Sequence, residues 1–145
     1  MLCWLPLLVT VQSEAHMALG ERVEAMVAAR EGIDRARTGG CIYHEAAAQL
    51  ALVQILLATD GEVPRVEIEA ALDRAEELVA AVEGRSLSPR ILELHGRLAA
   101  ALGDMPGAGQ ALREALDLYR MIGATGHAAR LALEIQPTSS QGEQP

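Results

Sequence analysis

The sequence contains no lysine, no asparagine and no phenylalanine, and aromatic residues make up only 2% of it. A P-loop, a Schiff-base site and a Ser–Lys catalytic pair each need a lysine, so all three are excluded. All 12 basic residues are arginines, and 20 acidic residues bring the net charge to −8. Nucleic-acid binding favours basic patches and aromatic stacking platforms. The composition therefore predicts a chain that does not bind nucleic acid.

Cysteine occurs only at Cys3 and Cys41. A small secreted domain that depends on disulfides carries more cysteines than this, and the apolar content of the chain allows a core without them. We therefore interpret both cysteines as small buried apolar side chains rather than as a Cys3–Cys41 disulfide.

One uncharged apolar run covers residues 2–11. It is far shorter than the roughly 20 residues that cross a bilayer, so it predicts no membrane span. No basic residue precedes it, whereas a signal peptide starts with a basic segment. We interpret the run as a core helix of a cytoplasmic protein. The alternative is an exported protein that is cleaved near Ser13-Glu14-Ala15.

Helical periodicity runs through most of the chain. Half of the 145 residues are apolar, which is enough for the core of one domain. They recur at steps of three and four, with no sustained alternation. This pattern predicts an all-α protein with a helical domain over residues 1–136 and a disordered polar tail over 137–145. The predicted helices cover residues 2–19, 22–37, 42–59, 66–82, 89–102, 106–122 and 126–135.

Glycine, proline and short polar residues mark the ends of these helices. Ser88, which precedes a proline, and Asp104 are predicted N-caps. A left-handed glycine commonly ends a helix. Such residues are expected at Gly39-Gly40, Gly84 and Gly123.

Small residues repeat at matching places in successive helix pairs. Gly20 and Gly103 each lie seven residues after a small residue and five before an alanine. Two antiparallel helices approach closely only where small side chains occupy their crossing point. Equivalent marks 43 and 40 residues apart predict a stack of about three antiparallel helix pairs, 2–37, 42–82 and 89–122, with a capping helix at 126–135. The repeat positions are Ser13, Gly20, Ala25, Gly32, Ala51, Ala75, Gly96, Gly103, Ala108 and Ala115.

This spacing of small residues resembles the tetratricopeptide repeat over residues 2–135. The resemblance implies that the helix pairs form a right-handed solenoid. Three phrases add a narrower likeness: WLPLL with EAHMALG at 4–8 and 14–20, EIEAALDRA at 67–75 and YRMIGATGHA at 119–128. They resemble the C-terminal helical repeats of bacterial signalling proteins that also carry an adenylate/guanylate cyclase domain and an AAA-type ATPase domain. The resemblance implies a scaffold or sensor, as a detached or truncated C-terminal piece of such a protein. No cyclase or ATPase residue carries over to this chain.

The sequence shows no constellation typical of an active site or a metal site. Its four histidines do not stand at metal-ligand spacing, and His44-Glu45 lacks the second histidine of a zinc-protease motif because position 48 is alanine. Gly107-Ala108-Gly109 lacks the strand and the third glycine of a dinucleotide-binding loop. We therefore predict that the protein is not an enzyme and takes no cofactor and no metal.

A protein-interaction or scaffold module is the function that these patterns favour. The first helices of the pairs line the concave face of a helical solenoid, and mixed charges there suit a protein or peptide partner of complementary charge. The alternative is that these are ordinary solvated positions. The predicted partner-binding residues are Thr10, Glu14, Glu45, Gln49, Arg90, Glu93 and Arg97.

Two further surfaces suggest other functions. An apolar edge at the first helix predicts self-association, or contact with an earlier repeat or a partner, because arrays normally end in polar faces; it comprises Leu2, Trp4, Leu5, Leu7 and Leu8. The alternative function is that of a sensor whose helix pairs hold a small hydrophobic effector. Its binding residues would be Leu50, Val53, Leu57 and Leu94.

Overall fold

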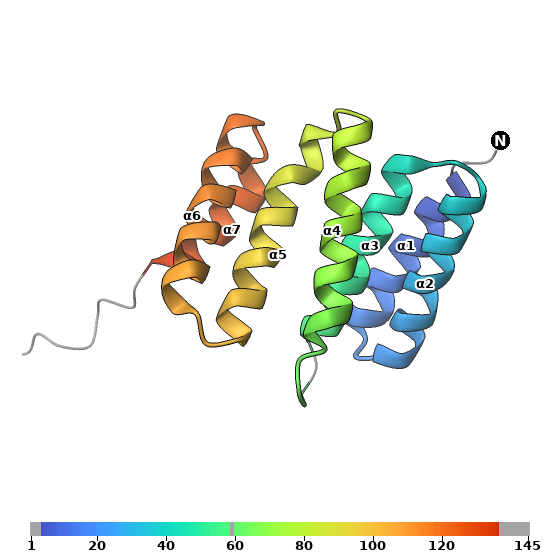
Figure 1. Cartoon of the computed structure of the whole chain (residues 1–145), viewed down its shortest axis with the longest axis horizontal. Coiled ribbons are helices and arrows are strands. Elements are labelled where there is room, and N and C mark those ends of the chain that lie inside the picture. The colour runs from blue at the N-terminus through green and yellow to red at the C-terminus, as the bar shows by residue number, and fades with distance from the viewer. Residues whose placement is uncertain (1–3, 59, 137–145) are drawn as a thin grey trace, which may run out of the picture.

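The computed structural model describes residues 4–58 and 60–136, and it confirms the all-helical class. Within these ranges there are seven α-helices, one short 3-10 helix and no strand (Figure 1). Every predicted helix is present, with its ends within two residues of the predicted ones wherever they are described. The helices are α1 (Trp4–Ala18), α2 (Arg22–Thr38), α3 (Ile42–Leu57), α4 (Arg65–Ala81), η1 (Arg85–Leu87), α5 (Ser88–Ala101), α6 (Met105–Met121) and α7 (Thr125–Ile135).

The helices pack mainly against their neighbours in the chain. α1 packs on α2, α3 on α4, and α5 on α6, and each pair then contacts the next, so that the pairs form a row from α1 to α7 (Figure 1). The helices α1, α3 and α5 also contact one another in that order, while α7 packs on α6. Helix α4 contacts α5 much less closely than α2 contacts α3.

The core consists of apolar side chains shared between successive pairs. The larger cluster runs from α2 to α5 and includes Leu50, Ile55, Ile68 and Leu72, none of which is more than 1% exposed. A smaller cluster joins α6 to α7 around Leu131. No single helix pair buries its apolar face alone, so the stability of the row depends on contacts between neighbours.

Small residues lie where helices of a pair cross. Ser13 on α1 donates a hydrogen bond of 2.9 Å to the carbonyl oxygen of Ala25 on α2. At Gly96 on α5, an added Cβ would lie 3.3 Å from the carbonyl oxygen of Ala108 and 2.9 Å from Cγ of Leu112 on α6. Gly20 and Gly103 are exposed turn residues, and the other predicted repeat positions are buried: Ser13, Ala25, Gly32, Ala51, Ala75, Gly96, Ala108 and Ala115.

Helix ends follow the predicted signals in part. Asp104 caps α6, since its carboxylate accepts a hydrogen bond of 3.0 Å from the amide of Gly107. The prediction for Gly84 is wrong, because Gly84 has φ −75° and Glu83 is the residue with a positive φ, of 51°. Ser88 is not an N-cap either, since η1 leads directly into α5 and no side-chain hydrogen bond caps that helix. The left-handed glycines are Gly20, Gly40, Gly103 and Gly123.

Some sequence predictions fall outside the described residues, namely those for Leu2, Cys3 and the tail 137–145.

Cys41 is buried at the start of α3 and is disulfide-bonded, so the expectation of a free thiol at this position is wrong. Leu5, expected on the exposed apolar edge, is half-buried. The domain limit at residue 136 stays a prediction.

The close crossing of α5 and α6 predicts opposite effects for two glycine substitutions. Gly96→Ala is expected to lower the free energy of unfolding by about 1–2 kcal/mol, because its methyl group overpacks the crossing. Gly109→Ala, also inside a helix, is expected to raise it by about 0.5–1 kcal/mol, since its added Cβ meets only the flexible guanidinium of Arg113. Urea denaturation of both variants measures the two values. A gain in stability for Gly96→Ala would contradict the close crossing.

The left-handed conformation of Glu83 predicts a second change in stability. Glycine adopts a positive φ without the steric cost that a Cβ brings, so Glu83→Gly is expected to raise the free energy of unfolding by about 0.5–1 kcal/mol. Glu83→Ala is the control, because it removes the carboxylate and retains the Cβ. Thermal and urea denaturation compare the variants, and an equal gain in both would assign the effect to charge instead.

Candidate functional site

The candidate site is the central cavity, which has a volume of about 810 Å³. The first helices of the three pairs, α1, α3 and α5, supply most of its wall, and α6 and α7 complete it. Its lining residues are Ser13, Glu14, Met17, Ala18, Ala51, Gln54, Ile55, Leu57, Ala58, Arg90, Glu93, Leu94, Arg97, Tyr119, His127 and Arg130.

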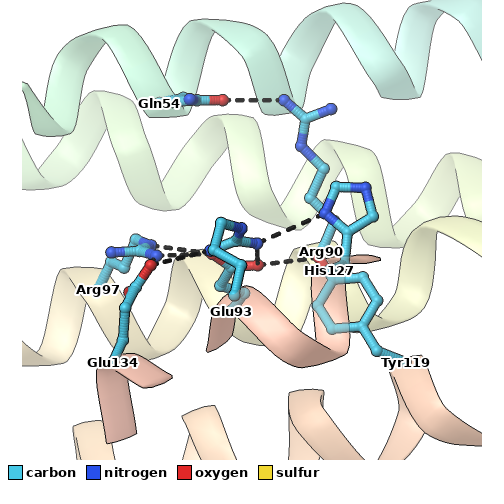
Figure 2. A network of polar contacts seen from close by, with 8 residues as sticks. Gln54, Arg90, Glu93, Arg97, Tyr119, His127 and Glu134 are labelled. Atoms are coloured by element: carbon cyan, nitrogen blue, oxygen red, sulfur yellow. Dashed lines mark hydrogen bonds and ion pairs between the residues drawn. The ribbon is translucent and has the colours of Figure 1, made fainter. Parts of the chain in front are cut away.

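A buried carboxylate, that of Glu93, organises the polar wall of the central cavity (Figure 2). Glu93 on α5 is 6% exposed and accepts hydrogen bonds from three helices. Arg97, one turn further along α5, donates at 2.7 Å, and the Tyr119 hydroxyl on α6 donates at 2.9 Å. Arg130 on α7 donates through both terminal nitrogens, each at 3.0 Å. These contacts tie α6 and α7 to α5.

The Glu93 carboxylate stays ionised because its partners outweigh its burial. Burial alone raises the pKa of Glu93, but hydrogen bonds from Arg130, Arg97 and Tyr119 lower that pKa to about 2, from an ordinary value of 4.5. In turn, burial and the Glu93 contact raise the pKa of the Tyr119 hydroxyl, which therefore stays protonated and donates. The hydrogen bond to Glu93 also raises the pKa of Arg130.

Two of the arginines in the cavity wall are already paired with acids. Arg97 and Arg130 both donate to Glu134 as well, at 2.8 Å and 3.1 Å. The ring of His127 stacks on that of Tyr119, with centroids 5.1 Å apart. Figure 2 shows these groups on either side of Glu93. This part of the wall is a satisfied structural network.

Arg90 is less strongly paired than these two arginines. It reaches from α5 toward α3, where it donates a hydrogen bond of 3.0 Å to the neutral side chain of Gln54 (Figure 2). Its ion pair within the described part of the chain is with the carboxylate of Glu14, 3.8 Å away, and the Glu14 side chain is 52% exposed. Arg90 therefore offers a positive charge to the cavity that an exposed, displaceable acid balances only in part.

The structure brings together some of the predicted partner-binding residues and separates others. Glu14, Arg90, Glu93 and Arg97 all line the central cavity, whereas Thr10, Glu45 and Gln49 do not. Four of the predicted positions are buried rather than open on a face, namely Thr10, Glu45, Gln49 and Glu93. Little of these four side chains is accessible to a partner, and their role in partner binding stays a prediction.

The physical reason is that neighbouring helices cover these positions. The Thr10 hydroxyl donates to the carbonyl oxygen of Pro6 at 2.9 Å inside α1. Glu45 on α3 accepts from Arg37 on α2 and Arg74 on α4, each at 3.1 Å, so the preceding pair and the second helix of its own pair enclose it. A buried carboxylate must be paired and hydrogen-bonded to be tolerated, and both arginines do this.

Sequence reasoning missed the contribution of α6 and α7 to the cavity. Tyr119, His127 and Arg130 were predicted only as parts of a second helix and a capping helix. The spacing of Arg130 and Glu134, one turn apart on α7, indicated a charged face but not its partner on α5. Of the predicted effector-binding residues, Leu57 and Leu94 line the cavity, while Leu50 and Val53 are completely buried in the core.

Metal binding and membrane insertion have no structural sign in the described ranges. His, Cys, Asp and Glu side chains within residues 4–58 and 60–136 form no group of three that could hold a metal ion. Over the same ranges no helix is both long enough and apolar enough to cross a bilayer.

The chain was compared with known proteins by sequence and by structure. No protein-family model matches it, and neither does any curated protein or solved structure.

The Glu93 network predicts a specific loss of stability in acid. The pKa of Glu93 is lower in the folded state than in the unfolded chain. The contribution of the ionised carboxylate to the free energy of unfolding is therefore fully present above about pH 5 and is lost as the pH falls through about 2. A shift from 4.5 to about 2 corresponds to about 3 kcal/mol.

Urea denaturation across this pH range, with Glu93→Gln beside the parent chain, measures that contribution. The stability difference between the two chains is expected to shrink toward acid pH. Glu134→Gln is the matched control, because this exposed carboxylate binds the same two arginines and is expected to change the pH dependence much less. Equal effects of the two substitutions would contradict the role of the buried carboxylate.

Proposed function

We propose that the protein is a non-catalytic helical-repeat module that binds a segment of a protein or peptide partner in the central cavity. One observation carries the proposal: α1, α3 and α5 together line a cavity of about 810 Å³ that exposes Arg90 among apolar side chains. Peptide recognition commonly combines an apolar groove with one or a few charged contacts that set orientation.

The lining of the cavity defines the chemistry of the partner. Met17 and Leu57, which are partly exposed, offer apolar contact surface, and the buried side chains of Ile55 and Leu94 also line the cavity. A carboxylate of the partner would take the place of Glu14 at Arg90, whose guanidinium has a planar set of donors suited to a carboxylate. An acidic side chain next to apolar ones is therefore the recognition feature we assign to the partner.

A tetratricopeptide-like right-handed solenoid is the architecture that goes with this function. The packing of helices in successive pairs and the small residues at the α1–α2 and α5–α6 crossings support it. The resemblance to the repeat region of bacterial cyclase–ATPase signalling proteins favours a scaffold or sensor role, in the cytoplasm, within or beside such a protein.

The function predicts a charge-dependent preference for acidic peptides. A random peptide library displayed on phage is selected on the full chain, and the affinities of the enriched peptides are measured by fluorescence anisotropy. The peptides are expected to contain Asp or Glu beside apolar residues. The Arg90→Glu substitution is expected to lower their affinity by about tenfold or more, because a charge-assisted contact is lost.

Arg113→Glu is the matched control, because it makes the same charge change on an exposed residue of α6 outside the cavity. It is expected to leave the affinities unchanged, and circular dichroism checks that both variants are folded. Enriched peptides that bind Arg90→Glu as tightly as the parent chain would overturn the proposed site.

A further inference from the structure

Four large apolar side chains form an exposed stripe along α1. Trp4, Leu7, Leu8 and Val11 recur at steps of three and four, so they share one side of the helix. Each remains about half exposed, between 47% and 54%. No residue from 4 to 13 carries a charge. These four residues are called the α1 stripe below.

The register of the helix pairs shows which positions in α3 and α5 correspond to the stripe. The small residues Ser13, Ala51 and Gly96 mark equivalent places in the first helices of the three pairs. Counting five residues back from each mark, Leu8 corresponds to Ala46 and Ile91. Counting two back, Val11 corresponds to Gln49 and Leu94.

These equivalent positions are buried between pairs. Ala46 and Ile91 are 0% and 5% exposed, and Gln49 and Leu94 are 6% and 4% exposed. They are covered because α3 packs on the α1–α2 pair and α5 packs on α3 and α4. At Leu8 and Val11 the α1 stripe therefore corresponds to surface that the other two pairs use for contact with a neighbouring helix. At Trp4 and Leu7 the match is partial, because the equivalent Leu87 and Glu45 are buried while Ile42 and Arg90 are not.

The exposed apolar side chains on α2 differ from the α1 stripe, because the equivalent positions on α4 are exposed as well. Val23 and Val27 are 72% and 62% exposed. Counted from Ala25 to its equivalent Ile68, they correspond to Val66 and Ala70 on α4, and both of these are also exposed. Exposure on α2 is thus a regular property of the second helices, whereas exposure on α1 departs from the pattern of the first helices.

We propose that the α1 stripe is a self-association surface on which α1 of a second copy packs, with the two stripes facing each other across a two-fold axis. The stripe is uncharged, so two copies of it meet without like-charge contacts, while the net charge of −8 opposes association through most other surfaces. A two-fold contact needs only one self-complementary patch on each copy.

A head-to-tail arrangement is less suited to these helices. In the row, a first helix is covered by the preceding pair, and the second helices α2, α4 and α6 already contact α3, α5 and α7. A head-to-tail contact is therefore left with the outer face of α7 in a second copy, where Leu133 is the one large apolar side chain that the described part of α7 exposes. The stripe also lies apart from the central cavity, whose α1 residues are Ser13, Glu14, Met17 and Ala18. The proposal accordingly does not depend on the proposed function.

The single tryptophan of the chain gives a direct test, because it lies in the stripe. Sedimentation equilibrium and Trp4 fluorescence are measured on the full chain over a wide range of protein concentration. The mass is expected to rise from 15.4 kDa toward twice that value. The fluorescence emission is expected to shift to shorter wavelength with the same midpoint, since packing removes Trp4 from water.

Two variants separate the stripe from general surface hydrophobicity. Leu8→Glu places a carboxylate in the contact and is expected to weaken the dimer by more than about a hundredfold. Val23→Glu makes a similar change on α2 and is expected to leave the dimer unchanged within about twofold. Circular dichroism and thermal unfolding show that both variants keep the helical fold.

Three results would overturn the proposal. The first is a monomer at every concentration, including one that binds another protein through the stripe. The second is an equal loss of association for Leu8→Glu and Val23→Glu. The third is an open-ended series of larger species, which a closed two-fold contact does not form.

Discussion

Where α1 crosses α2, the hydroxyl of Ser13 reaches the backbone carbonyl of Ala25, and where α5 crosses α6, Gly96 leaves no room for a methyl group. Helices that approach this closely have their larger side chains directed outward from the crossing, toward the neighbouring pair. That is why the largest apolar cluster extends over several helices from α2 to α5 rather than lying inside one pair. The same contact between neighbours that stabilises the row also leaves the first helix with an apolar face half exposed.

Buried carboxylates provide the second set of links along the row. Glu45 is held by arginines from α2 and α4, and Glu93 by arginines on α5 and α7 and by a tyrosine on α6. An unpaired carboxylate at such positions would be strongly unfavourable, so each one selects an arrangement in which the neighbouring helices bring their cations close. In a chain with no lysine, the planar guanidinium of arginine can serve two acids at once, as Arg97 and Arg130 do for Glu93 and Glu134.

These structural pairings decide which charges remain available for binding. Arg97 and Arg130 are neutralised within the wall of the central cavity, whereas Arg90 faces a neutral amide and an exposed acid 3.8 Å away. The cavity and the α1 stripe occupy different parts of α1, so the two proposed surfaces can act at the same time. The central cavity combines charge with apolar contact, which favours selective binding. The α1 stripe is wholly apolar, which favours association without strong discrimination between partners.

Sequence alone determined the helices and the places where they come close. Periodicity, turn glycines and small residues depend on interactions within a few positions of the chain, so seven helices and the crossing residues Ser13, Ala25, Gly96 and Ala108 were predictable. The same local signals could not show which polar positions become internal. Glu45 and Glu93 look like solvated charges in the sequence, and only the packing of α2, α4 and α7 around them shows that they are buried. Arg130, 37 residues from Glu93, joins the candidate site for the same reason: the distance between remote residues is set by tertiary packing and not by local pattern.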